Sequence, residues 1–139
     1  MSKITHRLLI VLLALGSSPL LAQDDALVGS FGHEFTRVRD IPVWLVSHQP
    51  AGYRVRRTGD DNTFDAHEWT EGERAAFWER MWWPPTTSSA ARCVGTSEEV
   101  ICYVPASARK QIAWLSGYKS DYFNHSEMGG VMEIRRVSH

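Results

Sequence analysis

Residues 92–104 read RCVGTSEEVICYV and contain both cysteines of the chain, Cys93 and Cys102. If the chain reverses direction at Ser97 and Glu98, Cys93 lies directly opposite Cys102 in an antiparallel pair of strands. Directly opposed residues bring their Cβ atoms within the distance that a disulfide spans. The stretch therefore predicts a β-hairpin that a disulfide closes.

A disulfide also bears on the compartment in which the chain folds, because disulfides persist in oxidising compartments outside the cytosol. The start of the chain agrees: Lys3 and Arg7 are basic, an unbroken apolar run follows, and Ala22 is a small residue suited to cleavage. We expect residues 1–22 to be a cleaved secretory signal and residues 23–139 to form one globular domain. The alternative is an uncleaved membrane anchor, for which the apolar run is short.

The charge balance of the expected mature domain excludes one large class of partner. Lys3 and Arg7 fall in the expected signal, so 13 of the 15 basic residues remain against 16 acidic ones, a net charge of −3 with His neutral. Domains that bind DNA or RNA carry a basic excess. We therefore expect no nucleic-acid partner.

Residues 70–83 carry the strongest helix signal in the chain. Thr70 and Glu73 have the spacing of a capping box, in which each side chain caps the backbone of the other residue. Pro84 and Pro85 end the pattern, because proline is not tolerated in a helix interior. We expect one main helix over about residues 70–83.

Three further stretches read as β-strands. Residues 41–46 are apolar almost throughout, whereas residues 53–56 and 131–137 alternate between apolar and charged side chains. The disulfide-closed hairpin adds two strands. The expected fold class is therefore α+β: an antiparallel sheet of about five strands packed against the main helix, with a disulfide-stapled hairpin.

Two tryptophans end the predicted helix. Ala75, Trp78 and Trp82 recur on one stripe, and Trp83 follows directly. Neighbouring helical residues point about 100° apart, so Trp82 and Trp83 do not both face one core. The pattern leaves two alternatives. Either a second layer formed by residues 118–123 covers the second ring, or one ring stays partly exposed, where Trp beside Arg is typical of the hot spots of protein interfaces.

Arginines cluster in or beside the predicted strands. Arg54, Arg56 and Arg135 occupy outward positions, and on neighbouring strands they would form one face that binds carboxylates or phosphates. The alternative is cross-strand pairing with acidic residues, which is the common fate of surface charges.

No catalytic motif of high specificity is present in the sequence. His33 and His67 are each followed by Glu, but neither has a second His four residues later, as a zinc helix requires. The twelve residues from Asp60 to Glu71 have the length of a calcium loop, but Phe64 and Asp65 stand where an oxygen ligand and a glycine belong. We therefore expect no metal and no cofactor, and an acidic solvated turn at this position.

Two hypotheses of function follow. The first is a small exported non-enzymatic binding protein, periplasmic or secreted, of the inhibitor or immunity type. It would recognise a protein partner and have no stable membrane insertion after cleavage. Its expected binding residues are Trp82, Trp83, Arg54, Arg56 and Arg135. The alternative is a small exported hydrolase or metal-dependent enzyme that uses Asp65, His67, Glu68 or His125.

Overall fold

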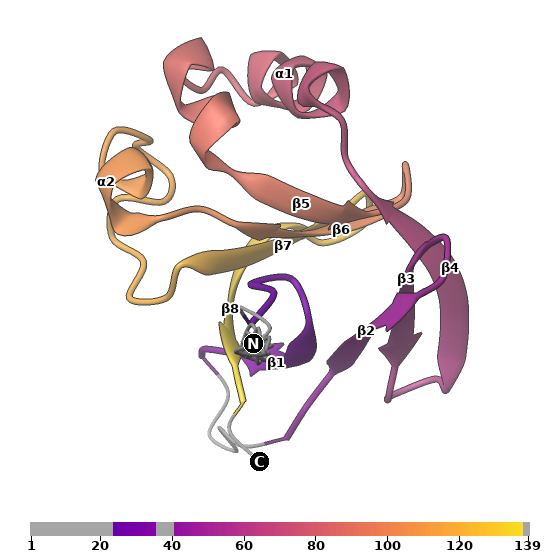
Figure 1. Ribbon diagram of the computed structural model, residues 1–139. Helices are drawn as coiled ribbons and strands as arrows, with labels where there is room; N and C mark the ends of the chain where they lie inside the picture. The colour runs from indigo at the N-terminus through magenta and orange to yellow at the C-terminus, as the bar shows by residue number, and fades with distance from the viewer. Residues whose placement is uncertain (1–23, 36–40, 138–139) are drawn as a thin grey trace, which may run out of the picture.

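A computed structural model describes residues 24–35 and 41–137, and in it eight antiparallel strands form a closed barrel (Figure 1). Each strand pairs with the next one along the chain, and the last pairs with the first, which completes the closure. The strands are β1 (Gly29–His33), β2 (Trp44–Gln49), β3 (Gly52–Arg57), β4 (Asn62–Glu68), β5 (Arg92–Gly95), β6 (Glu99–Tyr103), β7 (Tyr122–Ser126) and β8 (Gly130–Arg136).

Three short helices interrupt this order. The helix α1 (Glu71–Arg80) and the 3-10 helix η1 (Pro85–Ala90) connect β4 to β5, and α2 (Ala106–Arg109) follows β6. All three lie on one side of the molecule, over the outer surface of the barrel wall that β5, β6 and β7 form (Figure 1).

The predicted fold class is therefore wrong: the protein is not a sheet of about five strands against one main helix, but a closed barrel of eight strands. The strands missed were β1, β4 and β7, whose sequences are GSFGH, NTFDAHE and YFNHS. They contain glycines and polar residues in place of the apolar alternation that signals a strand. Pairing with neighbours on both sides supplies the hydrogen bonds that hold these segments extended.

Alternate residues of every strand point into the barrel, and there they form the first of two cores. Trp44 and Val46 of β2 belong to it, and Val46 lies directly opposite Val55 of the neighbouring strand β3. The predicted strand at residues 41–46 is shifted in the structure, because Ile41 is 57% exposed and the strand begins at Trp44. The fully assembled interior cluster consists of Leu27, Phe31, Trp44, Val46, Tyr53, Val55, Ala66, Val94, Ile101 and Ile134.

The second core lies outside the barrel, between its wall and the helices. Phe77 and Trp78 of α1 and Phe123 of β7 are all buried in it. The disulfide Cys93–Cys102 belongs to this core and is fully buried. Because β5, β6 and β7 contribute to both cores, these strands are covered on both faces.

The predicted hairpin is confirmed, together with its register. Cys93 lies opposite Cys102 with their Cα atoms 4.1 Å apart, and Val94 lies opposite Ile101. Gly95 follows on β5, where a Cβ atom would come within 2.2 Å of the carbonyl oxygen of Glu99. Only glycine fits at this close approach of two backbones.

The capping box of α1 is also confirmed, but the helix is shorter than expected. The Thr70 hydroxyl accepts from the Glu73 N–H, and the Glu73 carboxylate accepts from the Thr70 N–H. The helix ends at Arg80. Of the predicted stripe only Trp78 is buried, together with Phe77, whereas Ala75 and Trp82 are exposed.

The predicted secretory signal at residues 1–22 lies outside the described residues. Among residues 24–35 and 41–137, no helix has the length and apolar character that crossing a membrane requires. The disulfide indicates an oxidising environment for the folded chain.

Removing the disulfide tests its contribution to stability. We expect the double variant Cys93→Ala/Cys102→Ala to lose about 2.5–3 kcal/mol of unfolding free energy, because the open hairpin has more entropy in the unfolded state. Urea unfolding of the variant and of the wild type measures the difference. Reduction of the wild type with a thiol is the control, and it should destabilise the wild type while leaving the variant unchanged. A double variant as stable as the oxidised wild type would contradict this account.

Candidate functional site

The three predicted arginine sites do not come together. Arg54 and Arg56 point outward from β3, whereas Arg135 points outward from β8, and both β1 and β2 lie between these strands. Arg54 pairs with Asp65 of the neighbouring strand at 3.2 Å. Arg135 lies 3.4 Å from the carboxylate of Glu34. Arg54 therefore follows the alternative interpretation, in which these arginines pair with acidic residues of neighbouring strands.

The residues named for an enzyme are likewise dispersed. His67 lies 2.8 Å from the carboxylate of Glu73 on the outer surface, and the His125 ring packs edge-on against Phe77, with ring centroids 5.0 Å apart. Burial, together with the nearby charge of Arg80, holds the pKa of His125 below its ordinary value. Within the described ranges, no three His, Cys, Asp or Glu residues are grouped so that they could hold a metal ion.

The stretch considered as a calcium loop is mainly a strand. Residues 62–68 form β4, which pairs with β3 over residues 62–66 and with β5 at residues 67 and 68. Asp60 lies in the turn before this strand and pairs with Arg57 at 2.5 Å. The side chains of an extended strand alternate between two faces, so this segment does not form the loop that encircles calcium.

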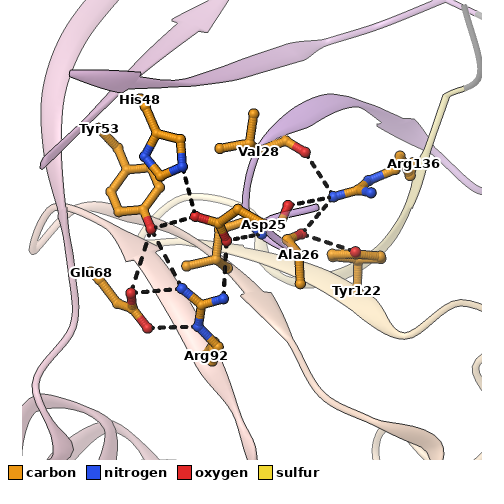
Figure 2. A network of polar contacts seen from close by, with 10 residues as sticks. Asp25, Ala26, Val28, His48, Tyr53, Glu68, Arg92, Tyr122 and Arg136 are labelled. Atoms are coloured by element: carbon orange, nitrogen blue, oxygen red, sulfur yellow. Dashed lines mark hydrogen bonds and ion pairs between the residues drawn. The ribbon is translucent and has the colours of Figure 1, made fainter. Parts of the chain in front are cut away.

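A polar network surrounds Asp25 (Figure 2). One carboxylate oxygen accepts from the Leu27 N–H and from Arg92, both at 3.0 Å. The other accepts from the Tyr53 hydroxyl at 2.8 Å and lies 3.1 Å from Nε2 of His48. This one side chain therefore joins the segment before β1 to β2, β3 and β5.

Two arginines complete the network. Arg92 donates to both carboxylate oxygens of Glu68 at 2.8 Å, in a bidentate pair. Arg136 donates through one nitrogen to the backbone carbonyls of Asp25, Ala26 and Val28, at 2.7–3.0 Å (Figure 2). The segment before β1 is thus attached to β8 as well.

The contacts in this network shift the pKa values of its groups in the direction that keeps the carboxylates ionised. Burial alone would raise the pKa of Asp25, but bonds from Leu27 and Tyr53 and the charge of Arg92 outweigh it, so the pKa lies below its ordinary value. The hydrogen bond from Arg92 lowers the pKa of Glu68. Burial and the neighbouring carboxylates raise the pKa of Tyr53 to about 12. With each charge compensated, the network serves to hold the barrel together.

A different arrangement is found at the end of α1, where the chain forms a Schellman turn. The Trp82 N–H donates to the carbonyl of Glu79 and the Trp83 N–H donates to the carbonyl of Trp78, both at 3.1 Å. The turn requires a left-handed residue after the C-cap Met81, and Trp82 takes this conformation with φ 57°. Glycine is the usual residue here, because a Cβ atom is strained at positive φ.

This turn separates the two tryptophans. Trp83 is buried, and its ring packs against Trp78 with centroids 5.0 Å apart. Trp82 is directed away from the core and is 95% exposed. Of the two alternatives for these tryptophans, the structure has the one in which a ring stays exposed, and the exposed ring is that of Trp82.

A shallow hollow lies on each side of Trp82. The first, of about 450 Å³, separates Trp82 from Trp114, which is itself 66% exposed. The second, of about 710 Å³, lies over α1 beside Ala75 and Ala76. We call the surface formed by Trp82, Trp114 and these two hollows the tryptophan face.

Sequence reasoning missed Trp114, although a signal for it exists. Ile112 and Leu115 are both fully buried and lie three residues apart, which is the spacing of one side of a helical turn. A residue directly before Leu115 therefore points away from the buried side.

A further hollow, of about 460 Å³, lies beside Arg57. The Arg57 guanidinium is already held by Asp60 and Glu99, and Glu99 also accepts from the Trp44 ring N–H at 2.8 Å. Arg57 is the only basic residue that lines this hollow, and its charge is already paired.

The network around Asp25 makes stability depend on acid pH. Since the pKa values of Asp25 and Glu68 are lower in the folded chain, their stabilising effect is complete above the unfolded-state values near 4. It is lost as the pH falls through the lower folded values. We expect Asp25→Asn to cost about 2 kcal/mol at neutral pH and to flatten the loss of stability below about pH 4. Urea unfolding across this pH range measures both effects, and the exposed neighbour variant Asp24→Asn should behave as the wild type.

The strain at Trp82 predicts an unusual substitution effect. We expect Trp82→Gly to raise the unfolding free energy by about 0.5–1 kcal/mol, because glycine adopts the left-handed conformation without strain and an exposed ring contributes little packing. Trp82→Ala is the matched control, since it removes the ring but keeps a Cβ atom, and it should give no such gain. Equal stabilities of the glycine and alanine variants would show that the position is unstrained.

Among the described residues, the tryptophan face presents two large exposed rings beside surface hollows. Exposed tryptophans of this kind are the side chains that contribute most to protein association. Comparison of the chain with protein-family models, with curated proteins and with solved structures finds no match.

Proposed function

We propose that the mature chain is an exported, non-enzymatic binding protein that recognises a protein partner through the tryptophan face. The observation that carries this proposal is the state of Trp82, which is 95% exposed at a positive φ. A left-handed conformation costs a non-glycine residue about 1–2 kcal/mol. The exposed ring makes few packing contacts that would offset this cost in the folded chain, so we assign the ring to an interaction with another molecule.

The scaffold beneath Trp82 supports such a role. Trp83 and Trp78 pack directly under the turn, and the Trp78 ring N–H donates to the Thr87 hydroxyl at 2.9 Å. A binding residue held on a packed support loses less entropy when the partner arrives. Trp83 therefore acts in this proposal by positioning Trp82, while the partner contacts Trp82 and Trp114.

The compartment is part of the proposal. The buried disulfide and the signal expected at residues 1–22 both support a periplasmic or secreted location. A small barrel that binds its partner through the tryptophan face suits an inhibitor or an immunity-type protein, since either acts by covering the surface of its partner.

Affinity capture tests the proposal. The immobilised mature protein and its Trp82→Gly variant are each exposed to an extract of the cell envelope of the source organism, and the retained proteins are compared. We expect the wild type to retain a partner that the variant does not retain. The variant should bind this partner at least about 30-fold more weakly than the wild type, which is the effect of truncating a hot-spot tryptophan.

Two controls make the result interpretable. Trp82→Gly is expected to be folded and stable, so loss of capture cannot be assigned to unfolding. Met128→Ala removes a side chain that is 99% exposed on another part of the surface, and it should retain the partner as the wild type does. If wild type and Trp82→Gly retain the same proteins in the same amounts, the proposal is wrong.

A further inference from the structure

The two hollows beside Trp82 carry opposite charges. In the hollow between Trp82 and Trp114, the only charged lining residue is Arg80. In the hollow over α1, the only charged lining residue is Glu79. Trp82 lines both hollows, so the two charges belong to different hollows that meet at the exposed ring.

Neither charge is neutralised by the part of the chain that the structure describes. Glu79 and Arg80 are both exposed, and neither has a side-chain hydrogen bond or an ion pair there. Arg80 contacts the Phe77 ring, 5.8 Å from its centroid, and its charge lowers the pKa of His125, but neither of these groups is negatively charged. Arg54, Arg57 and Arg92, in contrast, each have an acidic partner.

Small residues line the hollow that contains Glu79. Gly72, Ala75 and Ala76 recur at helical spacing before Glu79, and all of them line the hollow. Such small side chains let the backbone of another segment approach the helix, whereas on the other side Trp114 limits the hollow.

We infer that the tryptophan face takes a segment of the partner that carries three features in order. An acidic residue meets Arg80 in the hollow beside Trp114, an apolar side chain packs against the Trp82 ring, and a basic residue meets Glu79 over α1. This inference rests on the proposed function, and it adds the chemistry of the partner. Charge complementarity on both sides of one ring sets the direction in which the segment binds.

Selection from a displayed library of random linear peptides tests the inference. The wild-type mature protein and the variants Trp82→Gly, Arg80→Glu and Glu79→Arg serve as separate targets. We expect the wild type to enrich peptides with an acidic residue, an apolar residue and a basic residue in that spatial order, and Trp82→Gly to lose these peptides. Each single charge reversal should weaken a selected peptide about fivefold or more.

Charge exchange provides the decisive control. The double variant Glu79→Arg/Arg80→Glu keeps Trp82 and the net charge but reverses the order of the charges. It should bind peptides in which the acidic and basic residues are exchanged, and reject the original ones. Rescue of this kind cannot arise from a general structural effect of the substitutions.

The outcomes separate this inference from the proposed function. Peptides that depend on Trp82 but ignore both charge reversals overturn the charge arrangement and leave the binding function intact. A library that yields no Trp82-dependent peptide overturns the inference, while the envelope capture decides the proposed function independently. Trp82-dependent binding to vesicles of phosphatidylethanolamine and phosphatidylglycerol, or Trp82-dependent self-association in sedimentation, would replace the partner segment with a different occupant and overturn the inference.

Discussion

Closure of the barrel requires the backbone of β1 to pair with β2 on one side and with β8 on the other, although β1 has only five residues and two of them are glycines. This pairing removes the free edges that a sheet of eight strands would otherwise expose. It also encloses the interior core around Phe31 and Ile134. Arg136 of β8 bonds to the segment before β1, and Asp25 of that segment bonds to Tyr53 of β3 and Arg92 of β5. These bonds stabilise the closure because they attach the segment to several strands.

Closure in turn determines where the helices lie. The interior of the barrel is filled by its own side chains, so α1, η1 and α2 pack on the outside, over β5, β6 and β7. The buried disulfide joins β5 to β6 beneath this layer. The Schellman turn then follows from the short connection after α1: it directs Trp83 into the outer core and leaves Trp82 in solvent. The packing of Trp83 thus explains the left-handed backbone at position 82, but it does not explain why a tryptophan rather than a glycine occupies that position.

The tryptophan face differs in kind from the polar network around Asp25. In the network each charge has a partner, and the pKa values of Asp25 and Glu68 are lowered accordingly, which is the arrangement expected of groups that stabilise a fold. On the tryptophan face two exposed rings and two uncompensated charges lie together, which adds little to folding. The contrast between these two regions is the physical basis for placing function at Trp82.

Local patterns in the sequence determined the features that depend on residues close together along the chain. The hairpin register of Cys93 and Cys102 and the capping box of Thr70 and Glu73 both involve short separations. Only the tertiary structure decided the closure of the barrel, the contact of Asp25 with Arg92 across 67 residues, and the exposure of Trp82 rather than Trp83. These depend on which distant surface covers a given side chain. A strand such as β4, with few apolar residues, is held by the hydrogen bonds of its neighbours, and its own sequence records no sign of them.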